Sequence, residues 1–161
     1  MPERVTPGTG SLGAAEPLAD PKTKKILIVD DDESVLNLLE ILVRRDGFQI
    51  DSAITGEETM RKFREARPDA LILDLMLPGT TSGFEVLSRL REGKEPVPPI
   101  VVVTAYADTR EIQEIMKDSN VAVVLSKPIN QKKLLDTLHG VLGTAPPAFP
   151  NTPVNPKSKN T

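Results

Sequence analysis

The sequence predicts an α/β fold in which a doubly wound, five-stranded parallel sheet carries five helices. Five short apolar runs alternate with five segments whose apolar residues recur at helical spacing. Because consecutive parallel strands require crossover connections, this alternation places helices on both faces of one sheet. The pattern fills residues 25–143, the size of one ordinary domain, and no repeat of fixed period is visible.

Three strand–helix units form the first part of the pattern. The expected strands are apolar or β-branched runs at residues 25–30, 48–53 and 70–74. The second helix begins at Thr55 and stops before Pro68, and the third ends near Gly93. The first helix ends at Gly47, a common helix-ending residue, and carries Val35, Leu38, Leu39 and Leu42.

Two further units follow a proline-rich connection at residues 95–99. Residues 100–103 are the most β-branched run of the chain, and we expect a helix over residues 109–117 after them. A fifth strand at residues 121–125 leads to a last helix that Asn130 can cap. The apolar residues of that helix are Leu134, Leu135, Leu138, Val141 and Leu142.

Both ends of the chain are predicted to be tails. Residues 1–24 contain four prolines and three glycines with little apolar material, so we expect a disordered N-terminal tail. Residues 144–161 contain five prolines among polar residues, which favours a disordered tail or a linker.

Composition excludes several classes of function. The net charge of −3 gives no electrostatic case for binding nucleic acid. The absence of cysteine excludes disulfides and thiolate chemistry, and the single histidine, His139, argues against a histidine-rich metal site. There is no apolar run long enough to span a bilayer and no signal-peptide core, so we expect a cytoplasmic protein without membrane contact.

The chain is organised around residues 71–78, where an apolar strand ends in a lone carboxylate, Asp74. Apolar residues on both sides of this strand indicate a sheet that is covered on both faces. Open α/β sheets place their sites at the carboxyl ends of the strands, where Asp74 lies. Other predicted strands also end in reactive side chains, namely Asp30 and Asp31, Thr104, and Lys127.

Together these side chains suit a transferable phosphoryl group. Carboxylates that lie close together repel one another, and a hard cation such as Mg²⁺, which prefers oxygen ligands, removes that cost. Asp74 supplies a nucleophile, Lys127 a fixed positive charge and Thr104 a hydroxyl.

Each of these residues also has an ordinary structural interpretation. Asp74 can start a turn, and residues 30–32 can be a solvated acidic turn in which Asp32 caps the first helix. Thr104 and Lys127 can be a strand residue and a surface lysine. Their joint occurrence at four strand ends favours the functional interpretation over four separate structural ones.

The sequence resembles the receiver domain of two-component response regulators, the CheY-like family. The matching segments are KILIVDDDESVLNLLE, PDALILDLMLPG, GFEVLSRLR, PIVVVTAYAD and LSKPI, within residues 25–143. The resemblance implies a flavodoxin-like sheet in the order 2-1-3-4-5. It implies that Asp74 is the phosphoacceptor, that Asp30 and Asp31 form the acidic pair, and that Mg²⁺ binds Asp31, Asp74 and the Met76 carbonyl oxygen.

The resemblance also implies a mechanism and partners. The Asp74 carboxylate would attack a phosphohistidine of a sensor histidine kinase or a phosphotransfer protein, and the acyl phosphate would later hydrolyse. Thr104 would hydrogen-bond the phosphoryl group and Lys127, aimed inward by a cis bond to Pro128, would pair with it. A surface made of the fourth helix, fifth strand and fifth helix would then signal to a downstream protein effector, with a phosphorylation-dependent dimer as one form of output.

Three departures from the family pattern stand out. The switch aromatic usually found three residues before the lysine is Val124 here, and Tyr106 is the candidate to replace part of its role. The loop at residues 78–83 is one residue longer than the common form. The connection at residues 118–121 lacks the usual Gly-Ala pair.

Two alternatives to a phosphoaccepting signalling module remain. A haloacid-dehalogenase-like phosphatase would need a second aspartate two residues after Asp74, where this chain has Met76. A pseudo-receiver would act through protein contacts without phosphorylation, and Val124 mildly favours it. We therefore expect no enzyme acting on external substrates but a module that assists its own phosphorylation and dephosphorylation. The 18 residues at 144–161 are too few for a DNA-binding domain, so we expect a stand-alone receiver or a fragment of a larger regulator or hybrid kinase.

Overall fold

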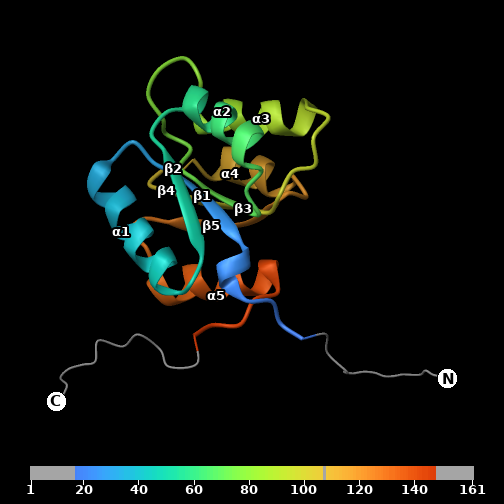
Figure 1. Cartoon of the computed structure of the whole chain (residues 1–161). Helices are drawn as coiled ribbons and strands as arrows, with labels where there is room; N and C mark the ends of the chain where they lie inside the picture. The colour runs from blue at the N-terminus through green and yellow to red at the C-terminus, as the bar shows by residue number, and fades with distance from the viewer. Residues whose placement is uncertain (1–16, 107, 148–161) are drawn as a thin grey trace.

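The computed structural model describes residues 17–106 and 108–147, so most of both expected tails lies outside the described residues. Within these ranges the chain forms a five-stranded sheet in the order β2-β1-β3-β4-β5, with every neighbouring pair parallel. The predicted fold class and strand order are therefore confirmed (Figure 1). The strands are β1 Lys25–Val29, β2 Gln49–Ala53, β3 Ala70–Leu73, β4 Ile100–Thr104 and β5 Val121–Ser126.

Helices cover both faces of the sheet, as the alternation of elements requires (Figure 1). The helix α1 packs with α5 on one face, whereas α2, α3 and α4 pack on the other. Their bounds are α1 Glu33–Arg45, α2 Gly56–Ala66, α3 Gly83–Glu92, α4 Thr109–Met116 and α5 Gln131–Leu142.

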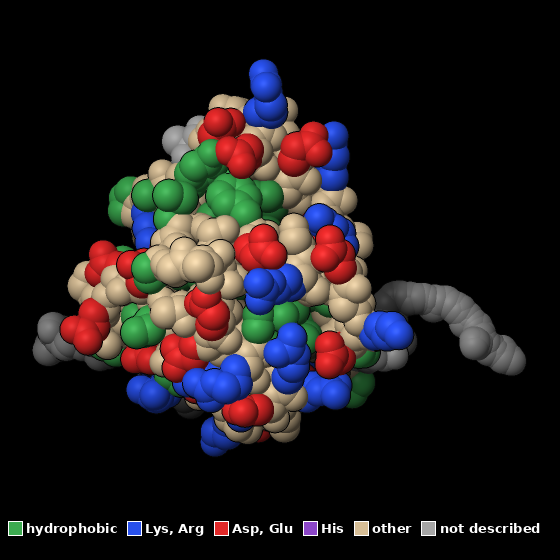
Figure 2. Space-filling model, turned by 90° about the horizontal axis from the view of Figure 1, so that it is seen from above, with side chains coloured by type: hydrophobic (Ala, Val, Ile, Leu, Met, Phe, Trp, Pro, Cys, Tyr) green, Lys and Arg blue, Asp and Glu red, His purple; other side chains and the backbone are tan. Residues whose placement is uncertain are grey.

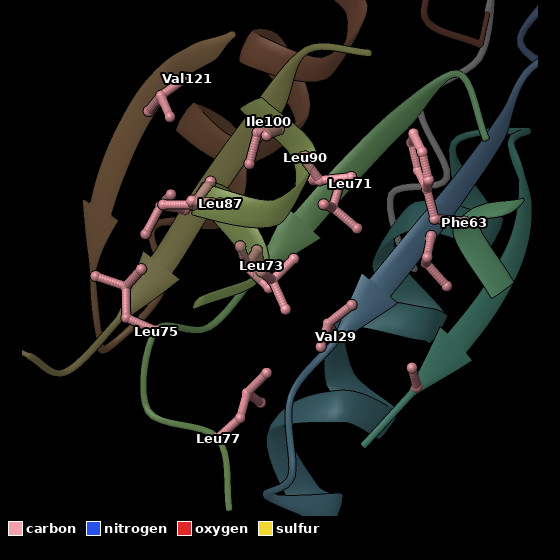
Figure 3. Packing of buried hydrophobic residues seen from close by; sticks show 14 of the residues in the cluster. Val29, Phe63, Leu71, Leu73, Leu75, Leu77, Leu87, Leu90, Ile100 and Val121 are labelled. Atoms are coloured by element: carbon pink, nitrogen blue, oxygen red, sulfur yellow. The ribbon is translucent and has the colours of Figure 1, made fainter. Parts of the chain in front are cut away.

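The central strand β3 is buried along its whole length, which explains its unbroken apolar sequence. Its side chains alternate between the two hydrophobic clusters, with Leu71 and Leu73 on one face and Ile72 on the other. Figure 3 shows Leu71 and Leu73 beside Leu87 and Leu90 of α3.

Polar N-capping residues fix where α1 and α5 begin. Asp32 caps α1, as predicted, by accepting hydrogen bonds from the amides of Ser34 and Val35. Asn130 caps α5, also as predicted, through the Lys133 amide. These caps place the first turns of both helices next to the carboxyl edge of the sheet.

The described parts of the expected tails, residues 17–24 and 144–147, make specific contacts with the domain and with each other. A 3₁₀ helix spans Pro21–Thr23, and Ala19 forms a parallel bridge with Thr144. The Ala19 amide donates to the Gly143 carbonyl oxygen at 2.8 Å. This pairing joins segments far apart in the sequence, so no local pattern indicated it. The domain boundaries at residues 25 and 143 stay predictions.

In the described ranges, no helix combines the length and the apolar character that a membrane span requires.

Candidate functional site

Backbone hydrogen bonds bring the predicted site residues together at the carboxyl edge of the sheet. The Asp74 amide donates to the Val29 carbonyl oxygen at 3.0 Å, which ties the end of β3 to the end of β1. The Lys127 amide donates to the Thr104 carbonyl oxygen at 3.0 Å, which ties the end of β5 to β4. The sheet itself therefore sets the positions of these side chains.

Lys127 links two carboxylates at this edge. Its Nζ lies 2.8 Å from Asp30 Oδ2 and 2.9 Å from Asp74 Oδ2. Both carboxylates are almost fully buried, with exposed fractions of 1% for Asp30 and 4% for Asp74. The bond between Lys127 and Pro128 is cis, as the resemblance implied.

Three carboxylates cluster where a metal ion could bind. Oxygens of Asp30, Asp31 and Asp74 all lie within 4.8 Å of one another, and Asp31 is exposed to solvent. Among the described residues, Asp30 Oδ2 is buried without a hydrogen-bond partner of good geometry, although Lys127 is near it. Hard oxygen donors of this kind, three carboxylates that share one ammonium group, fit a hydrated Mg²⁺ ion.

The cluster carries more negative than positive charge. Burial raises the pKa of the Asp30 carboxyl, and repulsion from Asp74 adds to the rise, while Lys127 and the Asp32 amide oppose it. Burial acts to lower the pKa of Lys127, but its two carboxylate partners outweigh burial and raise that pKa. The pKa values of Asp30 and Lys127 are both raised because one ammonium group faces two carboxylates. A further cation would neutralise the remaining negative charge.

Met76 lies next to this cluster on an exposed loop. Its amide donates to Asp74 Oδ1 at 3.1 Å, and its side chain is 54% exposed. The amide contact fixes the orientation of the Asp74 carboxylate, whose other oxygen faces Lys127.

Thr104 is buried at the end of β4, and its Oγ1 accepts a hydrogen bond from the Tyr106 amide at 3.1 Å. The Tyr106 hydroxyl donates to the Glu111 carboxylate on α4. The Tyr106 ring packs edge-on against Phe84 at 5.3 Å. Tyr106 thus connects the Thr104 position to α4.

Val124 does not join the acidic cluster. It is partly buried and packs, as Tyr106 does, against the hydrophobic cluster under α2, α3 and α4. The three predicted switch residues therefore lie on β4, β5 and the loop after β4, on the side of the sheet that α4 covers.

Sequence reasoning missed two polar arrangements. Glu57 at the start of α2 accepts hydrogen bonds from the hydroxyls of Thr80 and Thr81 in the loop after Asp74. The ring nitrogens of His139 lie 2.8 Å from Asp46 Oδ2 and 2.7 Å from Thr144 Oγ1. No local signal pairs residues so distant in the sequence, and the only hint available was a single histidine among the apolar residues of the last helix, where a buried ring needs polar partners.

On the face drawn in Figure 2, acidic and basic side chains of the described residues are interspersed, without an extended basic patch.

Comparison with known proteins identifies the family. The model of the response regulator receiver domain matches residues 26–139, and the chain belongs to this family of two-component signalling modules. The transcriptional regulatory protein AfsQ1 of Streptomyces coelicolor is 32% identical over 117 residues, 73% of this chain and 50% of that protein. The DNA-binding response regulator MtrA of Mycobacterium tuberculosis is 38% identical over 118 residues, 72% of this chain and 49% of that protein.

The chain thus spans about half the length of these curated relatives. Solved structures agree with the fold over nearly their whole length. A receiver domain from Bermanella marisrubri is 30% identical with a TM-score of 0.66, covering 73% of this chain and 96% of that one. A CheY-like receiver protein from Methanospirillum hungatei is 26% identical with a TM-score of 0.65, covering 74% and 93%.

Proposed function

We propose that this receiver domain accepts a phosphoryl group on Asp74 from a phosphohistidine of a sensor histidine kinase or phosphotransfer protein. One observation carries the proposal: Asp30, Asp31 and Asp74 converge within 4.8 Å, with the Lys127 ammonium beside them. A structural salt bridge would need one carboxylate, whereas this site holds three.

The residues present fit Mg²⁺, and each has a separate task. The Asp31 and Asp74 carboxylates and the Met76 carbonyl oxygen would hold the ion, with Asp30 completing the acidic cluster. When bound, the ion would neutralise phosphoryl oxygens. The amide of Met76 and the ammonium of Lys127 keep the Asp74 carboxylate in one orientation for attack.

Besides the two partners, the transfer step would need only a proton from solvent. One Asp74 carboxylate oxygen forms the new bond to phosphorus as the bond from phosphorus to the donor imidazole nitrogen breaks. The imidazole nitrogen keeps the electron pair and takes a proton from solvent. The module thereby assists its own phosphorylation, and later hydrolysis of the acyl phosphate, without turnover of an external substrate.

The signal would leave through the surface of α4, β5 and α5. A phosphoryl group on Asp74 adds negative charge that attracts Lys127 and the Thr104 hydroxyl. A shift of Thr104 disturbs its contact with the Tyr106 amide and, through Glu111, the position of α4. A downstream protein, rather than nucleic acid, would recognise this change, and a phosphorylation-dependent dimer is a second form of the same output.

Acetyl phosphate and Mg²⁺ test the proposal directly. We expect intact mass spectrometry to show one added phosphoryl group on the wild type and on Asp136→Asn, an exposed control on α5. Asp74→Asn should remain unmodified. An unmodified wild type would instead favour the pseudo-receiver, and a modified Asp74→Asn variant would move the acceptor to another residue.

A further inference from the structure

The loop at residues 75–82 carries Met76, whose amide donates to Asp74 Oδ1 at 3.1 Å and whose carbonyl oxygen is a proposed Mg²⁺ ligand, so the path of the loop matters for the proposed metal site. The loop lies between β3 and α3 and belongs to neither element, so no helix or strand hydrogen bonds hold it. The Gly83 amide closes it by donating to the Leu75 carbonyl oxygen at 2.9 Å. Its middle carries Thr80 and Thr81, whose hydroxyls have a separate anchor.

Glu57 of α2 provides that anchor. Its Oε2 accepts from the Thr80 hydroxyl at 2.8 Å and from the Thr81 hydroxyl at 3.1 Å. These hydroxyls, with Thr80 first, lower the pKa of the Glu57 carboxyl, so it stays ionised. Thr81 is buried at 1% exposure, whereas Thr80 lies on the surface. Charge-assisted contacts to two successive hydroxyls restrict the loop more than one contact would.

The loop is also wedged between α2 and the end of β3. A Cβ atom on Gly56 would lie 2.1 Å from the Thr81 carbonyl oxygen, so helix and loop backbones touch at this point. A Cβ atom on Gly83 would lie 2.2 Å from the Asp74 carbonyl oxygen. A shift of the Thr80–Thr81 segment away from α2 would therefore be passed along the short loop towards Met76 and Asp74.

We infer that Glu57 is a positioning residue for the metal site, acting through the loop that carries Met76. This inference rests on the proposed function, because it assigns Glu57 a part in holding the same ion. Glu57 has no contact with the carboxylate cluster, so its effect on metal affinity runs through Thr80 and Thr81.

Calorimetric titration of the apo protein with Mg²⁺ tests this role. We expect Glu57→Ala to bind about tenfold more weakly than wild type, as for other residues that orient metal ligands. Glu57→Gln keeps an acceptor oxygen and should recover most of the affinity. Glu58→Ala is the matched control, since Glu58 contacts the Ile54 amide, Arg61 and Lys62 but not the loop, and should leave affinity unchanged.

Backbone hydrogen exchange supplies a second readout. Glu57→Ala should speed exchange of the Met76 and Gly83 amides, which are hydrogen-bonded in this loop, while Glu58→Ala should not. Wild type without Mg²⁺ binding would overturn the proposed function. If Glu57→Ala binds Mg²⁺ as tightly as wild type does, only the role of Glu57 is overturned. The same holds if Glu58→Ala lowers the Mg²⁺ affinity as much as Glu57→Ala does.

Discussion

Nζ of Lys127 lies 2.9 Å from Oδ2 of Asp74, although the two residues are 53 positions apart in the chain. The same ammonium group lies 2.8 Å from Asp30, so one cation balances two buried carboxylates. Lys127 therefore stabilises two buried carboxylates of the fold and is also a member of the proposed phosphorylation site.

Replacing Lys127 by Met should destabilise the domain at neutral pH by about 2–3 kcal/mol, because two buried carboxylates lose their counter-charge. The pKa of Asp30, raised by burial, would rise further. The Asp30 carboxyl then binds a proton more tightly in the folded state than in the unfolded chain, where its pKa is near 3.8. The resulting penalty is absent below the unfolded value, grows as pH rises and is complete above the folded pKa.

Urea unfolding of Lys127→Met and wild type at several pH values measures this difference. We expect the stability gap between them to narrow in mild acid and to narrow again when Mg²⁺ is added at neutral pH. A gap independent of both would contradict the charge-balance explanation.

Mg²⁺ should raise the melting temperature of the wild type, because binding to the folded state alone adds stability. At a hundredfold excess over Kd the gain is about 2.7 kcal/mol. Asp31→Asn should lose most of this response, since Asp31 belongs to the carboxylate cluster. Asp32→Asn is the control, because asparagine keeps the α1 cap and Asp32 lies outside the cluster.

Tyr106 is the only tyrosine and the chain has no tryptophan, so ultraviolet absorbance reports its ionisation alone. The hydrogen bond to Glu111 raises the pKa of Tyr106 from 10.0 to about 12. We expect Glu111→Gln to move the midpoint of Tyr106 ionisation back towards 10.0. Because the folded pKa is the higher one, stability from this contact is full below the unfolded value and is lost as pH rises through about 12.

Asp46→Ala should cost about 1–3 kcal/mol in urea unfolding, because it leaves a buried nitrogen of His139 without its partner. Asp136→Ala removes an exposed pair with Lys132 and should change stability by less than about 0.5 kcal/mol. Equal effects of the two substitutions would show that the contact between Asp46 and His139 adds no stability.

Two glycines should respond oppositely to alanine. Gly83→Ala places a Cβ 2.2 Å from the Asp74 carbonyl oxygen and 2.5 Å from the Leu75 Cα, so we expect a loss of about 3 kcal/mol. A Cβ on Gly140 in α5 meets nothing within 4 Å, and Gly140→Ala should gain about 0.5–1 kcal/mol. Thermal unfolding compares them, and a tolerated Gly83→Ala would contradict the close approach of loop and strand.

Periodicity and helix caps were enough to predict the five strands, the five helices and the order in which they alternate. Apolar runs such as residues 100–103 and caps such as Asp32 act within a few residues, so a linear reading detects them. The convergence of Asp31, Asp74 and Lys127 was also predictable, because all parallel strands end at one edge.

Only the tertiary structure decided how the loops between these elements are anchored. The pairing of Glu57 with Thr80, of Asp46 with His139 and of Ala19 with Thr144 depends on where separate elements come to lie in space. Local propensities act over a few residues and carry no information about contacts between distant loops. The sequence pattern therefore determined the sheet and the residues at its carboxyl edge. Three-dimensional packing determined which side chains hold the loops at that edge in place.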